Sequence, residues 1–122
     1  MQDFRFLNWE AYKNSKEDFN FIIKLVNNFP QNLKFELDNQ ILRSFLSIVL
    51  NIAKGSGNSS DAKLNRFFNI AMESPNETLA AIDVAKDNKL ISDDEFKKIC
   101  DKLISIARQL GGLKLSVLDV LS

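Results

Sequence analysis

The sequence predicts an all-α protein that folds as an antiparallel, up-and-down four-helix bundle. Three breaks divide the 122 residues into four long segments, and the last segment repeats apolar residues at helical spacing. The polar–apolar alternation of a strand is missing, and no internal repeat is found. The length suits a single domain, residues 1–122. The expected helical segments are residues 4–29, 33–54, 60–87 and 92–120.

Each break has a composition that ends a helix. Pro30 follows Phe29, and residues 55–60 are rich in Gly, Ser and Asn, so we expect the longest loop there. The third break is Asp-Asn-Lys at residues 87–89. Pro75 lies inside the third segment, where it removes a backbone donor and is expected to bend the helix.

The fourth segment has the clearest helical pattern. Ser92 and Glu95 have the spacing of a capping box, which predicts the start of the helix. The apolar residues that step by three and four are Phe96, Ile99, Leu103, Ile106, Leu110, Leu113, Val117 and Val120. This heptad pattern is typical of helices that pack at a shallow angle. Gly111 and Gly112 interrupt it, and they either permit a close helix approach or weaken the helix.

The second segment is the most apolar helix of the chain. Residues 41–53 leave almost no polar face, so we expect other protein to surround this helix. We expect it to end abruptly at Gly55 and Gly57. The polar residues that interrupt it are Gln40, Arg43 and Asn51. Since an unpaired buried polar group costs about 1–3 kcal/mol, these residues are expected either to bond across subunits or to line the interior of a ring.

The first segment carries two apolar stripes, although one is enough for a four-helix core. The second stripe is rich in aromatic residues, which a monomer would expose. It therefore predicts a homo-oligomer. The interface residues expected from this stripe and from the polar residues of the second segment are Phe6, Trp9, Tyr12, Gln40 and Asn51.

Residues spread over nearly the whole chain carry a resemblance to a known family. They are Phe6, Trp9, Ala11, Phe29, Pro30, Gln40, Leu42, Arg43, Ser47, Ile48, Asn51, Ile52, Ala53, Gly55, Phe67, Phe68, Ile70, Ala71, Ser74, Glu77 and Leu110. In these residues the chain resembles the four-helix-bundle proteins encoded in intervening sequences of bacterial 23S rRNA genes. The accessory variability protein of diversity-generating retroelements resembles the same group. The most specific part is residues 40–55, where polar residues interrupt apolar ones at fixed spacing.

The resemblance implies a left-handed bundle that assembles into a homopentamer and has no enzymatic activity. The retroelement relatives are basic and bind nucleic acid and reverse transcriptase. The chain departs from the family pattern at three positions. Lys54 stands where an acidic residue is usual, Asn58 where a basic one is usual, and Pro75 where a small or aliphatic one is common. The fold is expected to survive these changes. Those at residues 54 and 58 bear on the charge of the loop and on a binding role tied to that charge.

The composition points away from an enzyme. Histidine is absent, which removes His-based triads and most zinc sites, so we expect no catalytic residues, cofactor, metal ion or small-molecule substrate. Cys100 is expected to be a buried inert thiol, and the acidic residues 93–95 to cap a helix rather than to hold a cation. Residues 55–57 are expected to form a turn rather than a phosphate cradle.

The chain is expected to be cytoplasmic. Its single cysteine cannot form an intrachain disulfide, and its first residues lack the apolar core of a signal peptide. The longest apolar stretch is too short to span a bilayer, so no membrane association is expected.

A local excess of positive charge is the remaining candidate for a site. Lys+Arg and Asp+Glu both number 16, but residues 39–72 hold four bases against Asp61 alone. These bases are Arg43, Lys54, Lys63 and Arg66. They are expected either to contact nucleic-acid phosphates, weakly and without sequence preference, or to form a solvated face.

Three functions follow from these observations. The favoured one is a non-catalytic homo-oligomeric scaffold that associates with RNA or DNA. The second is a nucleic-acid-binding accessory protein of a reverse transcriptase, which a neighbouring reverse-transcriptase gene would support. The third is an enzyme or ligand carrier that uses a cavity in the bundle, and the missing histidine argues against it.

Overall fold

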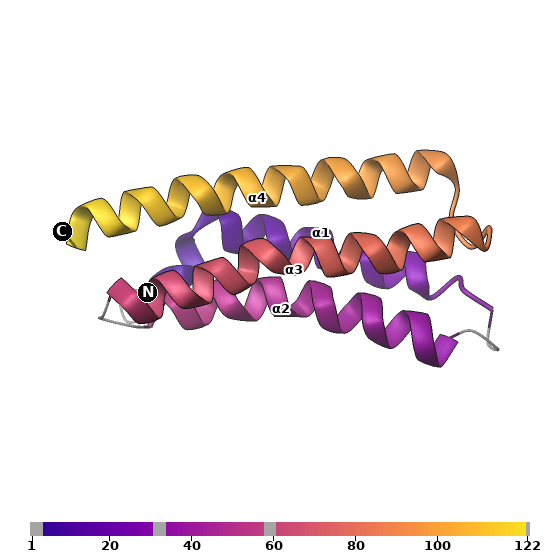
Figure 1. Ribbon diagram of the computed structural model, residues 1–122, viewed down its shortest axis with the longest axis horizontal. Helices are drawn as coiled ribbons and strands as arrows, with labels where there is room; N and C mark the ends of the chain where they lie inside the picture. Colours follow the sequence, from indigo (N-terminus) through magenta and orange to yellow (C-terminus); the bar gives the residue numbers. More distant parts are fainter. Residues whose placement is uncertain (1–3, 31–33, 58–60, 122) are drawn as a thin grey trace.

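The computed structural model describes residues 4–30, 34–57 and 61–121. Within these ranges the chain is all-α with no strand, and four long helices follow one another (Figure 1). The helices are α1 (Glu10–Val26), α2 (Asn39–Ser56), α3 (Asp61–Asp87) and α4 (Asp93–Leu121). Two short helical turns, η1 (Arg5–Asn8) and η3 (Lys34–Asp38), precede α1 and α2. The prediction of four helices is confirmed.

The four helices lie side by side around one core. The most extensive contact joins α2 to α3, and smaller ones join α3 to α4, α1 to α2 and α1 to α4. The helices share a cluster of buried apolar side chains, among them Ile22, Phe45, Ile82 and Ile106. Every one of the predicted heptad residues from Ile99 to Leu110 is buried. The heptad pattern of the fourth segment therefore identified its core face correctly.

The first segment is not a single helix. Its chain is extended at Trp9, with φ −75° and ψ 132°, and this residue separates η1 from α1. The Trp9 backbone N–H donates to the Phe6 carbonyl and closes the short turn. The break lets η1 reach the end of α2, where the Arg5 side chain donates to the Ser56 carbonyl at 3.1 Å. One of the orphan carbonyls at the end of that helix is satisfied in this way.

The second segment ends at Gly57, the C-cap of α2, as predicted, but not at Gly55. Gly55 lies inside α2, which continues to Ser56, so Gly55 does not end the helix. Its role is close packing: a Cβ on Gly55 would lie 2.8 Å from the Phe68 ring of α3. Of the loop expected near residues 55–60, Ser56 still belongs to α2 and Gly57 caps that helix. Residues 58–60, part of that expected loop, lie outside the described residues.

The second segment is also less enclosed than predicted. Leu46 and Leu50 of α2 are 37% and 46% exposed, and Arg43 is exposed beside them. Helix α2 contacts α1 on one side and α3 on the other, and a third face stays outside the bundle. The apolar composition therefore overstated how much of this helix one chain buries.

The turn between α3 and α4 has a defined capping geometry. The Leu90 N–H donates to Ala85 O and the Lys89 N–H to Lys86 O, which is the Schellman pattern. Lys89 has φ 59°, the left-handed conformation that this motif requires. The predicted capping box follows, since the Ser92 and Glu95 side chains each accept from the other's backbone N–H.

A ladder of hydroxyl and amide groups crosses the contact between α2 and α3. Ser44 Oγ lies 2.8 Å from Thr78 Oγ1, and Ser74 Oγ donates to Ser47 Oγ at 3.2 Å. The Asn51 side chain donates to the Ser47 carbonyl at 2.8 Å and also to its Oγ. These polar groups flank Pro75, which is buried and lies inside a helix that runs unbroken from residue 61 to 87.

No helix in the described ranges is long and apolar enough to cross a membrane.

Candidate nucleic-acid interface

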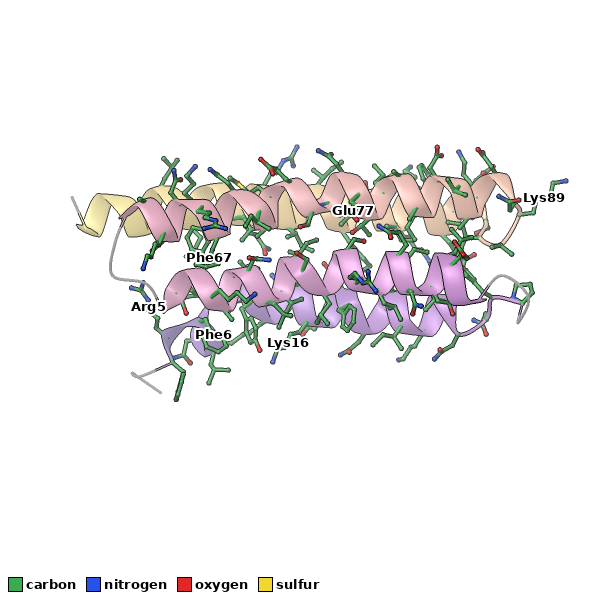
Figure 2. All side chains as sticks on the ribbon, turned by 60° about the horizontal axis from the view of Figure 1, so that its bottom comes forward. Arg5, Phe6, Lys16, Phe67, Glu77 and Lys89 are labelled. Atoms are coloured by element: carbon green, nitrogen blue, oxygen red, sulfur yellow. The ribbon has the colours of Figure 1, made fainter. Side chains whose placement is uncertain are left out.

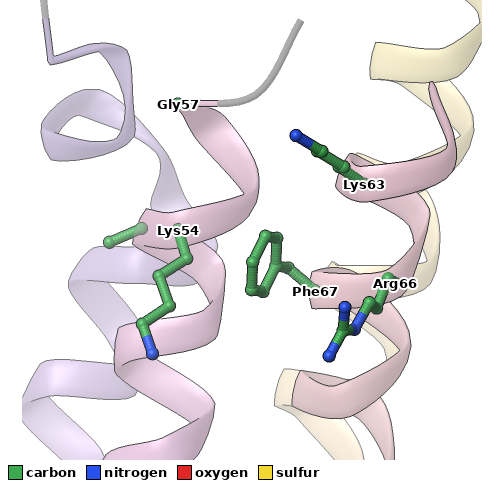
Figure 3. A pocket seen from close by; sticks show the side chains of 6 residues that line it. Lys54, Gly57, Lys63, Arg66 and Phe67 are labelled. Carbon is green, nitrogen blue, oxygen red and sulfur yellow. The ribbon is translucent and has the colours of Figure 1, made fainter. Parts of the chain in front are cut away.

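A surface pocket of about 370 Å³ lies between the end of α2 and the start of α3. We call it the basic pocket; its lining residues are Ala53, Lys54, Gly57, Lys63, Arg66 and Phe67. Figure 3 shows the Phe67 ring in the space between the two helices, with Lys54 on one side and Lys63 and Arg66 on the other. Three of the four bases predicted from the sequence therefore meet at one site.

Helical spacing explains how these residues come together. Lys63, Arg66 and Phe67 stand at positions i, i+3 and i+4, so they share one face of α3. Lys54 and Gly57 stand three residues apart at the end of α2. The short connection between α2 and α3 brings these two faces together at one end of the bundle.

Gly55 makes the close approach of the two helices possible. A Cβ at Gly55 would meet Phe68 at 2.8 Å and Phe67 Cβ at 3.5 Å, so α3 packs directly on the α2 backbone here. Phe68 is fully buried and contacts the Trp9 ring at 6.0 Å between centroids. The neighbouring Phe67 is then directed out of the core and into the basic pocket.

Phe67 is the pocket residue that the sequence reasoning missed. It was named among the residues that carry the family resemblance and not as a site residue. Adjacent residues of a helix point about 100° apart, so Phe67 and Phe68 cannot both face one narrow core. That pair of adjacent aromatic residues was the signal that could have identified it.

The electrostatic character of the site comes from exposed cations. The side chains of Lys54, Lys63 and Arg66 are exposed. Lys54 and Lys63 each also interact with another group of the protein. Figure 2 shows Arg5 at the same end of the bundle as Phe67, while Lys89 lies at the other end. Arg5 stacks over the Trp9 ring, 5.3 Å from its centroid, and adds a fourth positive charge to this end.

The fourth predicted base does not join the pocket. Arg43 is exposed on α2, eleven residues before Lys54. At the helical rise this is about 16 Å along the axis. Arg43 is therefore not part of the basic pocket, and its expected contact with another subunit stays a prediction.

A second pocket, of about 380 Å³, lies toward the other end of the same pair of helices and has the opposite charge. Its lining includes the carboxylates of Glu36 and Glu77, with Gln40 and Val84. Phosphate groups would be repelled there. A phosphate-binding function on this face is thus confined to the basic pocket.

The aromatic residues predicted for an oligomer interface have contacts within the chain. The Phe6 and Tyr12 rings meet edge to face at 4.8 Å, Lys16 lies 4.8 Å from the Tyr12 centroid, and Trp9 packs on Phe68. All three rings are half-buried. Their exposure in one chain is smaller than the sequence reasoning assumed.

The polar residues predicted for that interface also find partners within the chain. The Gln40 side chain donates to Glu77 Oε1 across α2 and α3, and the buried Asn51 donates to Ser47. The contact between α2 and α3 thus gives Gln40 its partner, and Asn51 has its partner one turn earlier in α2 itself. An additional contact with another subunit stays a prediction.

The other sequence candidates lie away from the basic pocket. Cys100 is half-buried on α4. Residues 93–95 form the first turn of α4, where their carboxylates face the positive end of the helix dipole. Groups of three or more potential metal ligands do not occur among the described residues.

The fold and the pocket together define a class: an all-α four-helix protein with a basic, aromatic-containing pocket on its surface. The family model described as 23S rRNA-intervening sequence protein matches residues 8–112. The chain therefore belongs to the family of 23S rRNA-intervening sequence proteins.

A solved structure is similar to the chain over most of both lengths. It is that of a protein with unknown function from the S23 ribosomal protein family of Bacteroides thetaiotaomicron VPI-5482. The two are 26% identical and superpose with a TM-score of 0.78, covering 85% of this chain and 94% of that one. No curated protein matches the chain at significant similarity.

Proposed function

We propose that the protein is a non-catalytic, cytoplasmic, homo-oligomeric scaffold that binds nucleic acid weakly through the basic pocket. The observation that carries this proposal is the convergence of Lys54, Lys63 and Arg66 around one pocket. Lysine and arginine side chains contact phosphate oxygens without reading sequence, so binding is expected to be independent of sequence.

The charge of the whole chain limits the strength of this binding. Because the formal net charge is zero, long-range attraction of a polyanion is weak and only the local cluster acts. Three phosphate contacts on a single strand give a slope of log K against log salt of about −2. Affinity per pocket is expected to be roughly micromolar or weaker at physiological salt, and several pockets on one oligomer would increase it.

The decisive variant reverses the three charges of the basic pocket. Lys54→Glu, Lys63→Glu, Arg66→Glu is expected to abolish the anisotropy change of a labelled 20-mer RNA at low salt, while the far-UV circular dichroism stays unchanged. A matched control is Lys24→Glu, Lys97→Glu, Lys98→Glu, which makes the same change in net charge at exposed positions of α1 and α4. The control is expected to bind far better than the pocket variant.

Arg43→Glu separates the pocket from the rest of the predicted basic region. Because Arg43 lies about three helical turns from Lys54, this variant is expected to lose less than threefold in affinity. If wild-type protein fails to bind RNA or DNA at low salt, the pocket is only a solvated face. If the pocket variant binds as well as the control, the contact lies elsewhere.

We also propose an antiparallel, left-handed bundle. Two contacts support opposite directions for neighbouring helices: Lys114, late in α4, donates to Asn69, early in α3, and Arg5 donates to Ser56 at the end of α2. The handedness rests on the resemblance to the family.

The proposed oligomer is a homopentamer. The family resemblance suggests the number, and the exposed Leu46 and Leu50 on α2 support a subunit contact, because they lie one turn apart on one face. Light scattering on a size-exclusion peak is expected to give five times 13.9 kDa. Leu50→Glu is expected to yield smaller species with unchanged helicity. A monomer at high protein concentration would disprove the assembly.

A further inference from the structure

We propose that Phe67 is a stacking platform for one unpaired base, so that the basic pocket selects single-stranded over double-stranded nucleic acid. This inference rests on the proposed function, and it adds the kind of nucleic acid that the pocket binds. The carrying observation is an aromatic ring in a surface pocket whose rim is built by Lys54, Lys63 and Arg66 (Figure 3).

Phe67 does not occupy the fully buried position of this part of α3. Its neighbour Phe68 takes the fully buried position against Trp9. Phe67 is only half-buried, and its ring lines the basic pocket. A large ring that is held partly open at the surface, rather than replaced by a polar residue, is available to a ligand.

The arrangement of the pocket suits a base attached to a phosphate backbone. The ring lies between the two helices, and the cations come from both of them, Lys54 from α2 and Lys63 and Arg66 from α3. A base that enters the space between the helices would meet the ring, while the phosphates on either side of it would meet the cations. Proteins that bind single strands combine these same two elements.

A duplex cannot use the ring. The faces of its bases are covered by their stacked neighbours, so a protein ring reaches them only where a base is unpaired. The pocket, at about 370 Å³, has the size of a small-ligand cleft and does not form a groove that could hold a helix of nucleic acid. The cations alone would bind single strands and duplexes alike.

The test measures two ligands with three variants. Fluorescence anisotropy at low salt would use a labelled 12-mer of oligouridine and a blunt 12-base-pair RNA duplex of mixed sequence. Phe67→Ala is expected to weaken single-strand binding roughly 5- to 150-fold, the range for losing one stacked base, with duplex binding changed less than twofold. Phe67→Leu, which keeps an apolar side chain but lacks a π face, is expected to resemble Phe67→Ala. Phe67→Tyr is expected to bind like the wild type.

A second readout reports stacking directly. In a Trp9→Phe background, Phe67→Trp places the only indole of the chain in the basic pocket. Oligouridine is expected to quench its fluorescence with the same midpoint as the anisotropy titration, and the RNA duplex is expected to leave it unchanged. Circular dichroism melts of every variant would confirm that the fold is kept.

The outcomes separate this inference from the proposed function. If Phe67→Ala binds oligouridine as the wild type does, while reversal of the three charges abolishes binding, the pocket contacts phosphates and the stacking proposal is wrong. If the charge reversal leaves binding intact, the proposed function itself fails. Equal affinity of the wild type for single strand and duplex would also overturn the inference.

Discussion

The contact between α2 and α3 and the contact of α4 with the bundle are built in different ways. The first combines direct backbone packing at Gly55 with a ladder of hydroxyl and amide groups around Ser44 and Thr78. The second consists of the apolar heptad residues of α4, with polar contacts at its edges: the ion pair between Lys102 and Asp18 and the hydrogen bond from Lys114 to Asn69. Hydrogen bonds and close backbone packing therefore fix the relative position of α2 and α3, the helices that carry the basic pocket. Apolar packing, which tolerates small changes of shape, holds α4 against the bundle.

The sharpest way to test this difference is to fill the space at Gly55. Gly55→Ala places a Cβ 2.8 Å from a fully buried ring, so Phe68 or a helix must move. We expect the free energy of unfolding to fall by about 1–3 kcal/mol, measured by urea denaturation. In combination with Phe68→Leu the loss is expected to be smaller than the sum of the two single losses. A strictly additive double variant would show that the two residues do not press on each other.

The hydroxyl ladder is expected to have the next largest effect. Thr78→Val keeps the shape of a fully buried side chain but removes its bond to Ser44, so a loss of about 1 kcal/mol is expected. Ser44→Ala should cost a similar amount. The double variant is expected to lose less stability than the sum of the two single losses, because it leaves neither hydroxyl without its partner. Thermal or urea unfolding of all four proteins completes the cycle, and full additivity would contradict a direct bond.

The glycines of α4 give the opposite expectation to Gly55. A Cβ at Gly111 or Gly112 meets no described atom within 4 Å. Neither glycine therefore permits a close helix approach within the described chain, and each costs helix stability. Gly111→Ala and Gly112→Ala are each expected to raise the free energy of unfolding by about 0.5–1 kcal/mol. A loss of stability instead, together with a smaller oligomer by light scattering, would place this part of α4 against another subunit.

The smallest expected effect concerns the ion pair between α1 and α4. Burial raises the pKa of Asp18, and the Lys102 ammonium at 3.4 Å only partly opposes this. The folded protein therefore holds the proton of this carboxyl more tightly than the unfolded chain does, so the ionised form costs stability at neutral pH.

Asp18→Asn is accordingly expected to be slightly more stable than the wild type at pH 7. The difference should disappear as the pH falls below the ordinary Asp value near 4, where the carboxyl is protonated in both states. Urea denaturation of the wild type and the variant at pH 7 and at pH 3 measures the difference in their free energies of unfolding at each pH. A variant that is less stable at pH 7 would show that the bond to Lys102 outweighs the cost of burial.

The two contacts also differ in how far the sequence could predict them. Apolar residues at heptad spacing specify burial on their own, so Ile99 to Leu110 were assigned to the core correctly. Polar residues on an apolar helix show only that a partner exists and not which one. Gln40 and Asn51 were therefore predicted to contact another subunit; the structure shows partners within the chain, Glu77 and Ser47, and the contact with another subunit stays a prediction.

The candidate site was predicted only in part, because the sequence alone does not show which residues lie next to one another in space. The count of charges in residues 39–72 found Lys54, Lys63 and Arg66. It also included Arg43, because such a count takes no account of how far apart two residues lie along a helix axis. The break at Trp9 was missed, since a single extended residue inside an aromatic-rich segment leaves the helical spacing on both sides nearly intact. Phe67 required the knowledge that Phe68 already fills the space beside Gly55.

Within the described ranges, the residues that line the basic pocket fall between 53 and 67, and α1 and α4 contribute none of them. The pocket is thus formed by one short stretch of the sequence, which joins α2 to α3 in a helical hairpin. Exchange of this short stretch between homologous chains would transfer the binding chemistry as a unit, while the heptad face of α4 and the core residues of α1 stay as they are. The stretch also holds Gly55 and the fully buried Leu64, so an exchanged stretch that keeps these two residues would change the ligand while the interior stays as it is.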